Sequence, residues 1–116
     1  IVDAAMNDLI RPTLYDAHHP IVTLAPPQNA IGKADIVGPV CETGDYLGID
    51  RDMPELVTGD KLAVLSAGAY GAVMASAYNT RPPAGEVLVY NHKAHILRPA
   101  RSLDSLLAEE TIPTFD

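Results

Sequence analysis

The segment GPVCETGDYLG, residues 38–48, contains the side chains with the clearest chemical potential in the sequence. Its cysteine, Cys41, is the only one in the chain; Glu42 follows directly and Asp45 stands three residues later. A polar, glycine-containing turn favours a thiol near a surface or a cleft. Neighbouring carboxylates disfavour a thiolate, so Cys41 suits proton donation better than nucleophilic attack. The alternative is a small buried hydrophobic residue at a strand end.

The two carboxylates that follow the cysteine allow two interpretations. Asp and Glu in a glycine-containing turn are commonly solvated, for local reasons. Alternatively, Glu42 and Asp45 bind an amine or the backbone of a partner. The residue types leave these two interpretations evenly balanced.

The segment RPTLY places Arg11 and Tyr15 four residues apart, on one face if the segment is helical. A guanidinium is a planar fork that matches a carboxylate, and a phenol adds a directional hydrogen bond. The pair could therefore bind the carboxylate of an amino acid. A surface arginine beside a tyrosine that covers the core is the alternative.

A third candidate is Tyr70, in the segment SAGAYG at residues 66–71. Small neighbours let the backbone approach a ligand while a phenol projects from it, although they also suit tight packing. The segment has neither the lysine nor the spacing of a P-loop. No metal site is expected, because neither His18 with His19 nor His92 with His95 has metal-binding spacing, and we expect these histidines at the surface.

Ten prolines and eight glycines divide the chain into short pieces, which favours short strands over long helices. We expect a mainly β fold, a small antiparallel barrel or sandwich with short helices. Strands are predicted at 20–26, 34–41 and 61–68, the last buried on both faces. A hairpin is predicted at 86–99, with its turn near 91–93. Helices are predicted at 7–19, interrupted by Pro12, and at 102–110, capped by Ser102, while the segment 68–79 is ambiguous.

The composition suits one domain over residues 1–116, since 47% of the residues are hydrophobic. The 8 basic residues are scattered among 15 acidic ones, which argues against a nucleic acid partner. A single cysteine fits a reducing compartment, so a cytoplasmic location is expected. No apolar run reaches the roughly 20 residues of a membrane span, and no leader is visible. The sequence starts without Met, as if it were part of a longer protein.

Three motifs in order, NDLIRPTLYDAHH, GPVCETGD and LSAGAYG followed by YNTRP, resemble the C-terminal part of the diaminopimelate decarboxylases. The resemblance runs from Val2 to about Pro99. It implies an enzyme of lysine biosynthesis that uses pyridoxal 5′-phosphate (PLP) and converts meso-diaminopimelate to L-lysine and CO2. It also implies an N-terminal (β/α)8 barrel that holds PLP, a C-terminal β domain, and a homodimer with active sites at the subunit interface.

The same resemblance implies a role for each candidate residue. Cys41 corresponds to the proton donor, and Glu42 to a carboxylate that binds the substrate. Arg11 and Tyr15 correspond to substrate-binding residues, and Tyr70 to a residue that touches both PLP and substrate. The lysine that anchors PLP belongs to the barrel and is not recognisable in this chain, so the chain alone should be inactive.

Other interpretations of these motifs remain. Decarboxylases of ornithine, arginine or carboxynorspermidine share the fold, but ornithine-type enzymes usually have aspartate after the cysteine, so Glu42 with RPTLY favours diaminopimelate. A non-catalytic homologue that binds other subunits would not need a thiol acid such as Cys41. An unrelated small β domain would have to match three motifs in order by chance.

Overall fold

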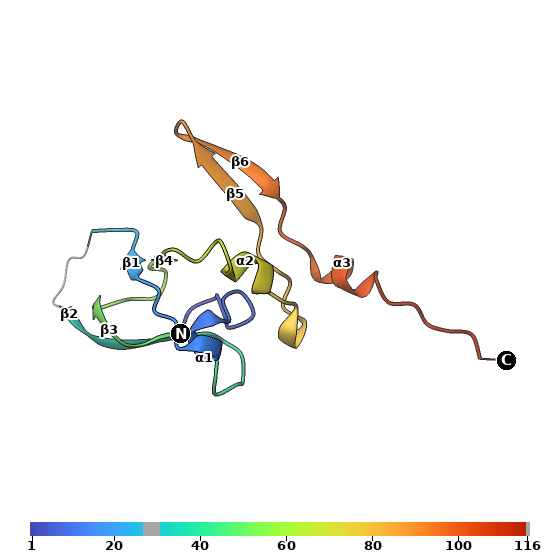
Figure 1. The fold of residues 1–116 in the computed structure, drawn as a ribbon, viewed down its shortest axis with the longest axis horizontal. Coiled ribbons are helices and arrows are strands. Elements are labelled where there is room, and N and C mark those ends of the chain that lie inside the picture. The colour runs from blue at the N-terminus through green and yellow to red at the C-terminus, as the bar shows by residue number, and fades with distance from the viewer. Residues whose placement is uncertain (27–30, 116) are drawn as a thin grey trace. The chain divides into compact units, whose positions relative to one another are not determined.

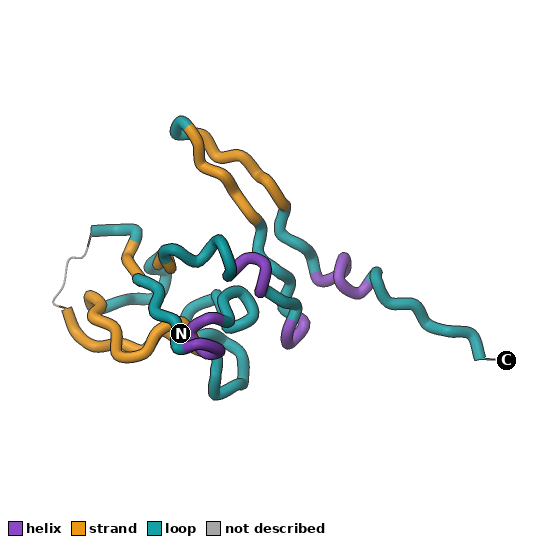
Figure 2. The backbone as a smooth tube through the Cα atoms, viewed as in Figure 1, coloured by secondary structure: helices purple, strands orange, loops and turns teal. Residues whose placement is uncertain are grey.

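The computed structural model describes residues 1–26 and 31–115 (Figure 1). The chain divides into two compact units, Ile1–Ala75 and Ser76–Asp116. The single domain expected over residues 1–116 stays a prediction. The described residues form mainly antiparallel strands with a few short helices, so the predicted fold class is confirmed (Figure 2).

Two antiparallel strand pairs build the first unit. Strand β1 (Ile21–Thr23) pairs with β4 (Leu62–Val64), and β2 (Ile31–Val37) pairs with β3 (Tyr46–Pro54). The β2–β3 register sets Ile31 opposite Pro54 and Val37 opposite Tyr46, with irregularities near Ile36. The buried apolar side chains that form the core of this unit are Leu9, Ile36, Leu47 and Met53.

The strand boundaries differ from those expected. The strand predicted at 34–41 begins earlier and ends at Val37, because Pro39 lacks an N–H and Gly38 turns the chain toward β3. Cys41 therefore lies in a loop. The strand predicted at 61–68 is shorter, covering Leu62–Val64, and its residues are half-buried, so burial on both faces was wrong for this structure. Strand β3 was not expected.

The exposed side of the β2–β3 pair carries a small charge cluster. The Lys33 ammonium lies 3.0 Å from a carboxylate oxygen of Asp52 and 3.5 Å from one of Asp50. The hydrogen bond to Asp52 and the charge of Asp50 raise the pKa of Lys33 above its ordinary value. These side chains are more than half exposed, so the cluster contributes little to stability.

Two short helices complete the first unit. Helix α1 (Arg11–Tyr15) begins where Pro12 can occupy the first turn, so the proline starts the helix and does not interrupt a longer one. Asp16 ends α1 in the left-handed conformation with φ 52°. Helix α2 (Gly71–Met74) lies in the segment that was ambiguous.

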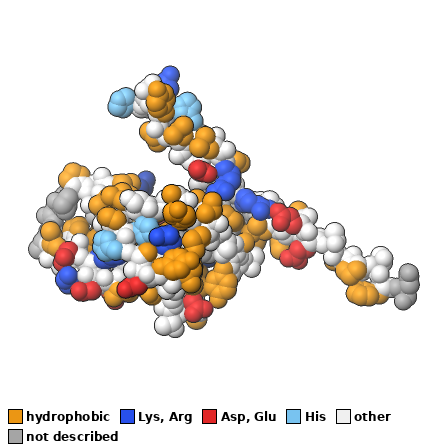
Figure 3. Space-filling model, viewed as in Figure 1, with side chains coloured by type: hydrophobic (Ala, Val, Ile, Leu, Met, Phe, Trp, Pro, Cys, Tyr) orange, Lys and Arg blue, Asp and Glu red, His pale blue; other side chains and the backbone are white. Residues whose placement is uncertain are grey.

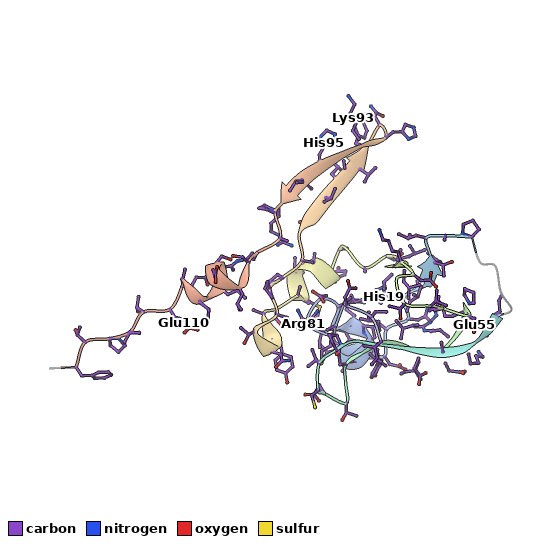
Figure 4. The ribbon with its side chains drawn as sticks, turned by 180° about the vertical axis from the view of Figure 1, so that it is seen from behind. His19, Glu55, Arg81, Lys93, His95 and Glu110 are labelled. Atoms are coloured by element: carbon purple, nitrogen blue, oxygen red, sulfur yellow. The ribbon has the colours of Figure 1, made fainter. Side chains whose placement is uncertain are left out.

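His19, expected at the surface, is buried with 5% of its area exposed (Figure 4). Its Nδ1 lies 3.2 Å from the carbonyl oxygen of Leu65, directly after β4, so a tertiary contact draws the ring inward. The expectation of surface histidines was wrong at this position, while His18, His92 and His95 are exposed.

The second unit contains the predicted hairpin and C-terminal helix, together with a short 3-10 helix at Tyr78–Thr80. Strands β5 (Glu86–Tyr90) and β6 (Lys93–Arg98) pair across a turn at Asn91 and His92, whose φ values are 48° and 60°. Lys93 and His95 lie toward that turn (Figure 4). Hydrophobic side chains cover the exposed hairpin (Figure 3), including Val87, Leu88, Val89, Tyr90, Ile96 and Leu97.

Helix α3 (Leu103–Leu107) follows the hairpin, and the Ser102 hydroxyl accepts a hydrogen bond from the Ser105 N–H at 3.1 Å, as the predicted cap requires. Among the described residues, no helix has the length and apolar character that crossing a membrane would need.

Candidate active site

Arg11 lies close to two tyrosine rings. Its guanidinium carbon is 5.7 Å from the ring centre of Tyr15 and 5.5 Å from that of Tyr70. Helix α1 places Arg11 and Tyr15 one turn apart, while Tyr70 arrives from the start of α2. Cation–π attraction at these distances orients the guanidinium without using its N–H donors. The side chains of Tyr15 and Tyr70 are 61% and 68% exposed, so both phenols can meet a ligand.

Cys41 and Glu42 lie on the loop between β2 and β3, and both are exposed. The loop closes on itself: the Glu42 N–H donates to the Val40 carbonyl at 2.8 Å, and the Asp45 N–H donates to the Glu42 carbonyl at 3.0 Å. At its base, the Gly38 N–H donates to the Asp45 carbonyl at 3.0 Å. These bonds give a short, defined loop that presents a thiol and a carboxylate to the outside.

Asp45 behaves differently from both interpretations of the sequence. Only 4% of its area is exposed, and its two carboxylate oxygens accept backbone N–H groups. Oδ1 accepts from Met6 at 2.7 Å, and Oδ2 accepts from Val40 at 2.6 Å. Asp45 is therefore neither a solvated turn residue nor an exposed site for an amine, but holds the backbone inside the loop.

Thr13 connects the loop to helix α1. Its hydroxyl donates a short hydrogen bond to the carbonyl oxygen of Gly44. A Cβ added at Gly44 would lie 2.7 Å from Cγ2 of Thr13, so the close approach requires a glycine. Through this contact, the helix that carries Arg11 and Tyr15 is bonded to the loop that carries Cys41.

We expect Thr13→Val to remove about 1 kcal/mol of stability, because the Gly44 carbonyl loses its donor. Amide hydrogen exchange over residues 11–17 and 38–46 in the full-length protein measures this, and both segments should exchange faster. Thr13→Ser keeps the hydroxyl, so amides in both segments should exchange as slowly as in the unchanged protein. Thr58→Val, at an exposed loop position, is the matched control. Unchanged exchange in Thr13→Val would mean that the hydroxyl does not hold the loop.

The structure thus brings Arg11, Tyr15 and Tyr70 into one cluster. Cys41 and Glu42 lie on a neighbouring loop that is bonded to the same helix. The catalytic and binding roles expected for these five residues stay predictions.

The residues that hold this site in place were not predicted from the sequence. They are Gly38, Thr13 and Asp45, whose carboxylate is buried. One signal was present for Asp45. It stands directly before β3 and two residues before the buried Leu47, so strand alternation extended by one residue would direct both side chains to the same, inward side. For Thr13 and Gly38, the contacts depend on residues distant in sequence, and we find no local pattern that predicts them.

Comparison with known proteins identifies relatives over nearly the whole chain. Residues 1–68 match the family model described as pyridoxal-dependent decarboxylase, C-terminal sheet domain. Diaminopimelate decarboxylase of Vibrio cholerae is 54% identical over 112 residues, which are 97% of this chain and 27% of that protein. The enzyme of the same name from Zymomonas mobilis is 51% identical over 110 residues, 95% of this chain and 26% of that protein.

Solved structures of related proteins are also similar to this chain. A crystal structure from Aquifex aeolicus matches with a TM-score of 0.89 and 50% identity, covering 92% of this chain and 27% of that chain. Diaminopimelate decarboxylase from Helicobacter pylori, in complex with L-lysine, matches with a TM-score of 0.87 and 44% identity, covering 93% of this chain and 27% of that chain. The chain therefore spans about a quarter of the length of the proteins that it matches.

Proposed function

We propose that this chain, which belongs to the family of pyridoxal-dependent decarboxylase C-terminal sheet domains, is part of an enzyme that converts meso-diaminopimelate to L-lysine and CO2. Relatives named diaminopimelate decarboxylase, 51% and 54% identical, support this substrate. The observation that carries the proposal is the Arg11 guanidinium within cation–π distance of two exposed tyrosine rings, on a helix bonded to the Cys41 loop.

The substrate's non-reacting end is itself an amino acid, with one carboxylate and one ammonium group. Arg11 offers a planar, permanently charged fork to that carboxylate, and Tyr15 adds a phenol one helical turn away. Glu42, exposed on the neighbouring loop, offers a charge of the opposite sign to the ammonium group. A substrate with only one of these groups at its far end would lose part of this recognition.

Part of a PLP site fits the residues of this chain. The Tyr70 phenol is exposed beside the Arg11 guanidinium, and a Cβ built at the nearby Gly68 would meet no atom within 4 Å, so the backbone there is open to a ligand. Gly71, by contrast, serves packing, since a Cβ there would lie 2.8 Å from Leu9. PLP supplies an electron sink for the electron pair left when CO2 departs. Tyr70 would contact the cofactor, while its anchoring lysine belongs to the rest of the protein.

The carbon that loses CO2 must take up one proton to give the CH2 group of L-lysine. We assign Cys41 as the proton donor. Its S–H is exposed to an incoming substrate, on a short loop that is closed by backbone hydrogen bonds within it. The thiol loses its proton to that carbon and regains one from solvent before the next turnover. A carboxylate such as Glu42, when ionised, has no proton to give and is suited to binding.

The rest of the protein is part of the proposal. An N-terminal (β/α)8 barrel would hold PLP, and the enzyme would act as a homodimer in which Cys41 and Glu42 reach the active site of the partner subunit. Their exposure in this chain supports such a role, because a second subunit can approach them. A free, exposed thiol suits a reducing compartment, so we place the enzyme in the cytoplasm.

A substrate panel tests this function. Full-length protein loaded with PLP is offered meso-diaminopimelate, ornithine, arginine and carboxynorspermidine at equal concentrations, with release of CO2 and amine products quantified. We expect kcat/KM for meso-diaminopimelate to exceed that of each rival substrate by about 10²-fold or more. The far end of each rival lacks one of the two charged groups, the carboxylate or the ammonium. Turnover of ornithine without turnover of meso-diaminopimelate would overturn the substrate assignment. Absence of all turnover, with PLP bound, would favour a non-catalytic subunit.

A further inference from the structure

We propose that Asp45 is a positioning residue for Cys41: its buried carboxylate fixes the loop so that the thiol is held at the reacting carbon. This inference rests on the proposed role of Cys41 as proton donor and adds to it the group that sets the thiol's place. Asp45 itself would not touch substrate or cofactor, since only 4% of its area is exposed.

Both carboxylate oxygens of Asp45 accept backbone N–H groups. Oδ2 accepts the N–H of Val40, the residue directly before Cys41, and Oδ1 accepts the N–H of Met6, 39 positions away in the chain. Hydrogen bonds to a charged acceptor are about twice as strong as neutral ones. One carboxylate therefore fastens the backbone at the thiol to a distant segment.

Met6, at the other end of this hydrogen-bonded bridge, belongs to a segment that is itself held in place. The Met6 segment is joined to β2 by the Val2 N–H, which donates to the Val37 carbonyl at 2.9 Å. Within the segment, the Ala5 N–H donates to Asp8 at 2.9 Å, and the core residue Leu9 follows. The bridge thus ties an exposed loop to a part of the chain packed in the core.

Gly38 keeps space free for the Asp45 carboxylate. A Cβ at Gly38 would lie 2.7 Å from Cγ of Asp45, so the backbone at the base of the loop passes directly beside the carboxylate. Gly38, which has no side chain, leaves the space in which the carboxylate lies, and the hydrogen bonds from Val40 and Met6 hold it there. The Asp45 side chain therefore has one well-defined position.

A double-mutant cycle in the full-length enzyme tests the inference. Asp45→Asn keeps the shape but replaces one acceptor oxygen by an NH2 donor, so one of the two backbone N–H groups loses its partner. The variant is made alone and together with Cys41→Ala, and kcat and KM are measured with meso-diaminopimelate. Asp60→Asn is the matched control, because Asp60 also accepts a backbone N–H, that of Val57, but in an exposed loop.

We expect Asp45→Asn to lower kcat by about tenfold or more, because the displaced thiol delivers its proton less efficiently, while KM rises only as far as Glu42, on the same loop, moves with it. In the Cys41→Ala background the same change should lower kcat by less than about twofold, since the thiol on which it acts is gone. Equal, additive losses in both backgrounds would overturn the inference and leave Asp45 a purely structural residue. Asp60→Asn should behave like the unchanged enzyme.

If the proposed function fails, the unchanged protein does not turn over meso-diaminopimelate at all. If only the role of Cys41 fails, Cys41→Ala keeps kcat near its normal value. Hydrogen exchange in the unchanged protein needs no variant and covers the case in which Asp45→Asn does not fold. The Val40 and Met6 amides should exchange at least about tenfold more slowly than the amide of exposed Thr43, because both are bonded to a buried carboxylate. Equally fast exchange at Val40 and Thr43 would contradict the bridge.

Discussion

Replacing Cys41 by alanine in the full-length protein should lower kcat for meso-diaminopimelate by about 10²–10⁴-fold, the contribution typical of a positioned general acid. Cys41 is exposed on a loop held by its own backbone bonds, so removal of its side chain takes away the proton and little else. Steady-state kinetics with detection of L-lysine measures the loss. The PLP absorbance band should persist, because the proposed function places the lysine that anchors the cofactor outside this chain.

Two controls sharpen this expectation. Cys41→Ser retains a proton on a weaker acid, and we expect it to be intermediate between the alanine variant and the unchanged enzyme. Thr43→Ala removes a hydroxyl from the same exposed loop and should retain nearly full kcat. Near-normal turnover of Cys41→Ala, with unchanged product, would remove the thiol from the role of proton donor.

Gly38→Ala should have the largest effect on stability. The new methyl group would lie 2.7 Å from Cγ of Asp45, closer than carbon atoms can approach without displacement. The Asp45 side chain is held by Met6 and Val40, so either a bond breaks or the backbone shifts. Steric strain and lost hydrogen bonds together should cost about 3 kcal/mol. Hydrogen exchange of the β2–β3 amides in the full-length protein measures this local stability.

Gly32→Ala is the matched control for this substitution. Gly32 lies in the same strand pair, in β2, and a Cβ built there has no atom within 4 Å. Alanine should be tolerated at Gly32 with unchanged exchange. If Gly38→Ala were equally silent, the loop would have room that the close approach to Asp45 does not indicate, and Asp45 could not be held in one position.

The parts of the fold that sequence predicted are those set by local interactions. The 86–99 hairpin followed from two apolar runs around Asn91, which tolerates positive φ, and the α3 cap followed from Ser102. Strand β3 escaped prediction because its middle is polar: the segment Ile49–Asp52 faces outward or carries charge, and only Leu47, Gly48 and Met53 are buried. Pairing with β2, not its own composition, makes it a strand.

The candidate site shows the same division. The types and spacing of Arg11 and Tyr15 predicted a helical pair, and the structure adds Tyr70 to it by a contact between segments nearly 60 residues apart, within one unit. The turn after Cys41 predicted an exposed thiol, which the structure confirms. The burial of Asp45 depends on the N–H of Met6, a partner that no pattern within the loop identifies.

The most direct test of the central claim is a crystal structure of the full-length protein with PLP and L-lysine bound. The measurement is the distance from the Cys41 Sγ to the carbon of L-lysine that carried the lost carboxylate. We predict about 3.5 Å, the separation of reacting atoms in a productive complex, with Arg11 on the product's carboxylate. A sulfur more than about 6 Å away, with another acid within hydrogen-bond reach of that carbon, would contradict the assignment of Cys41 as proton donor.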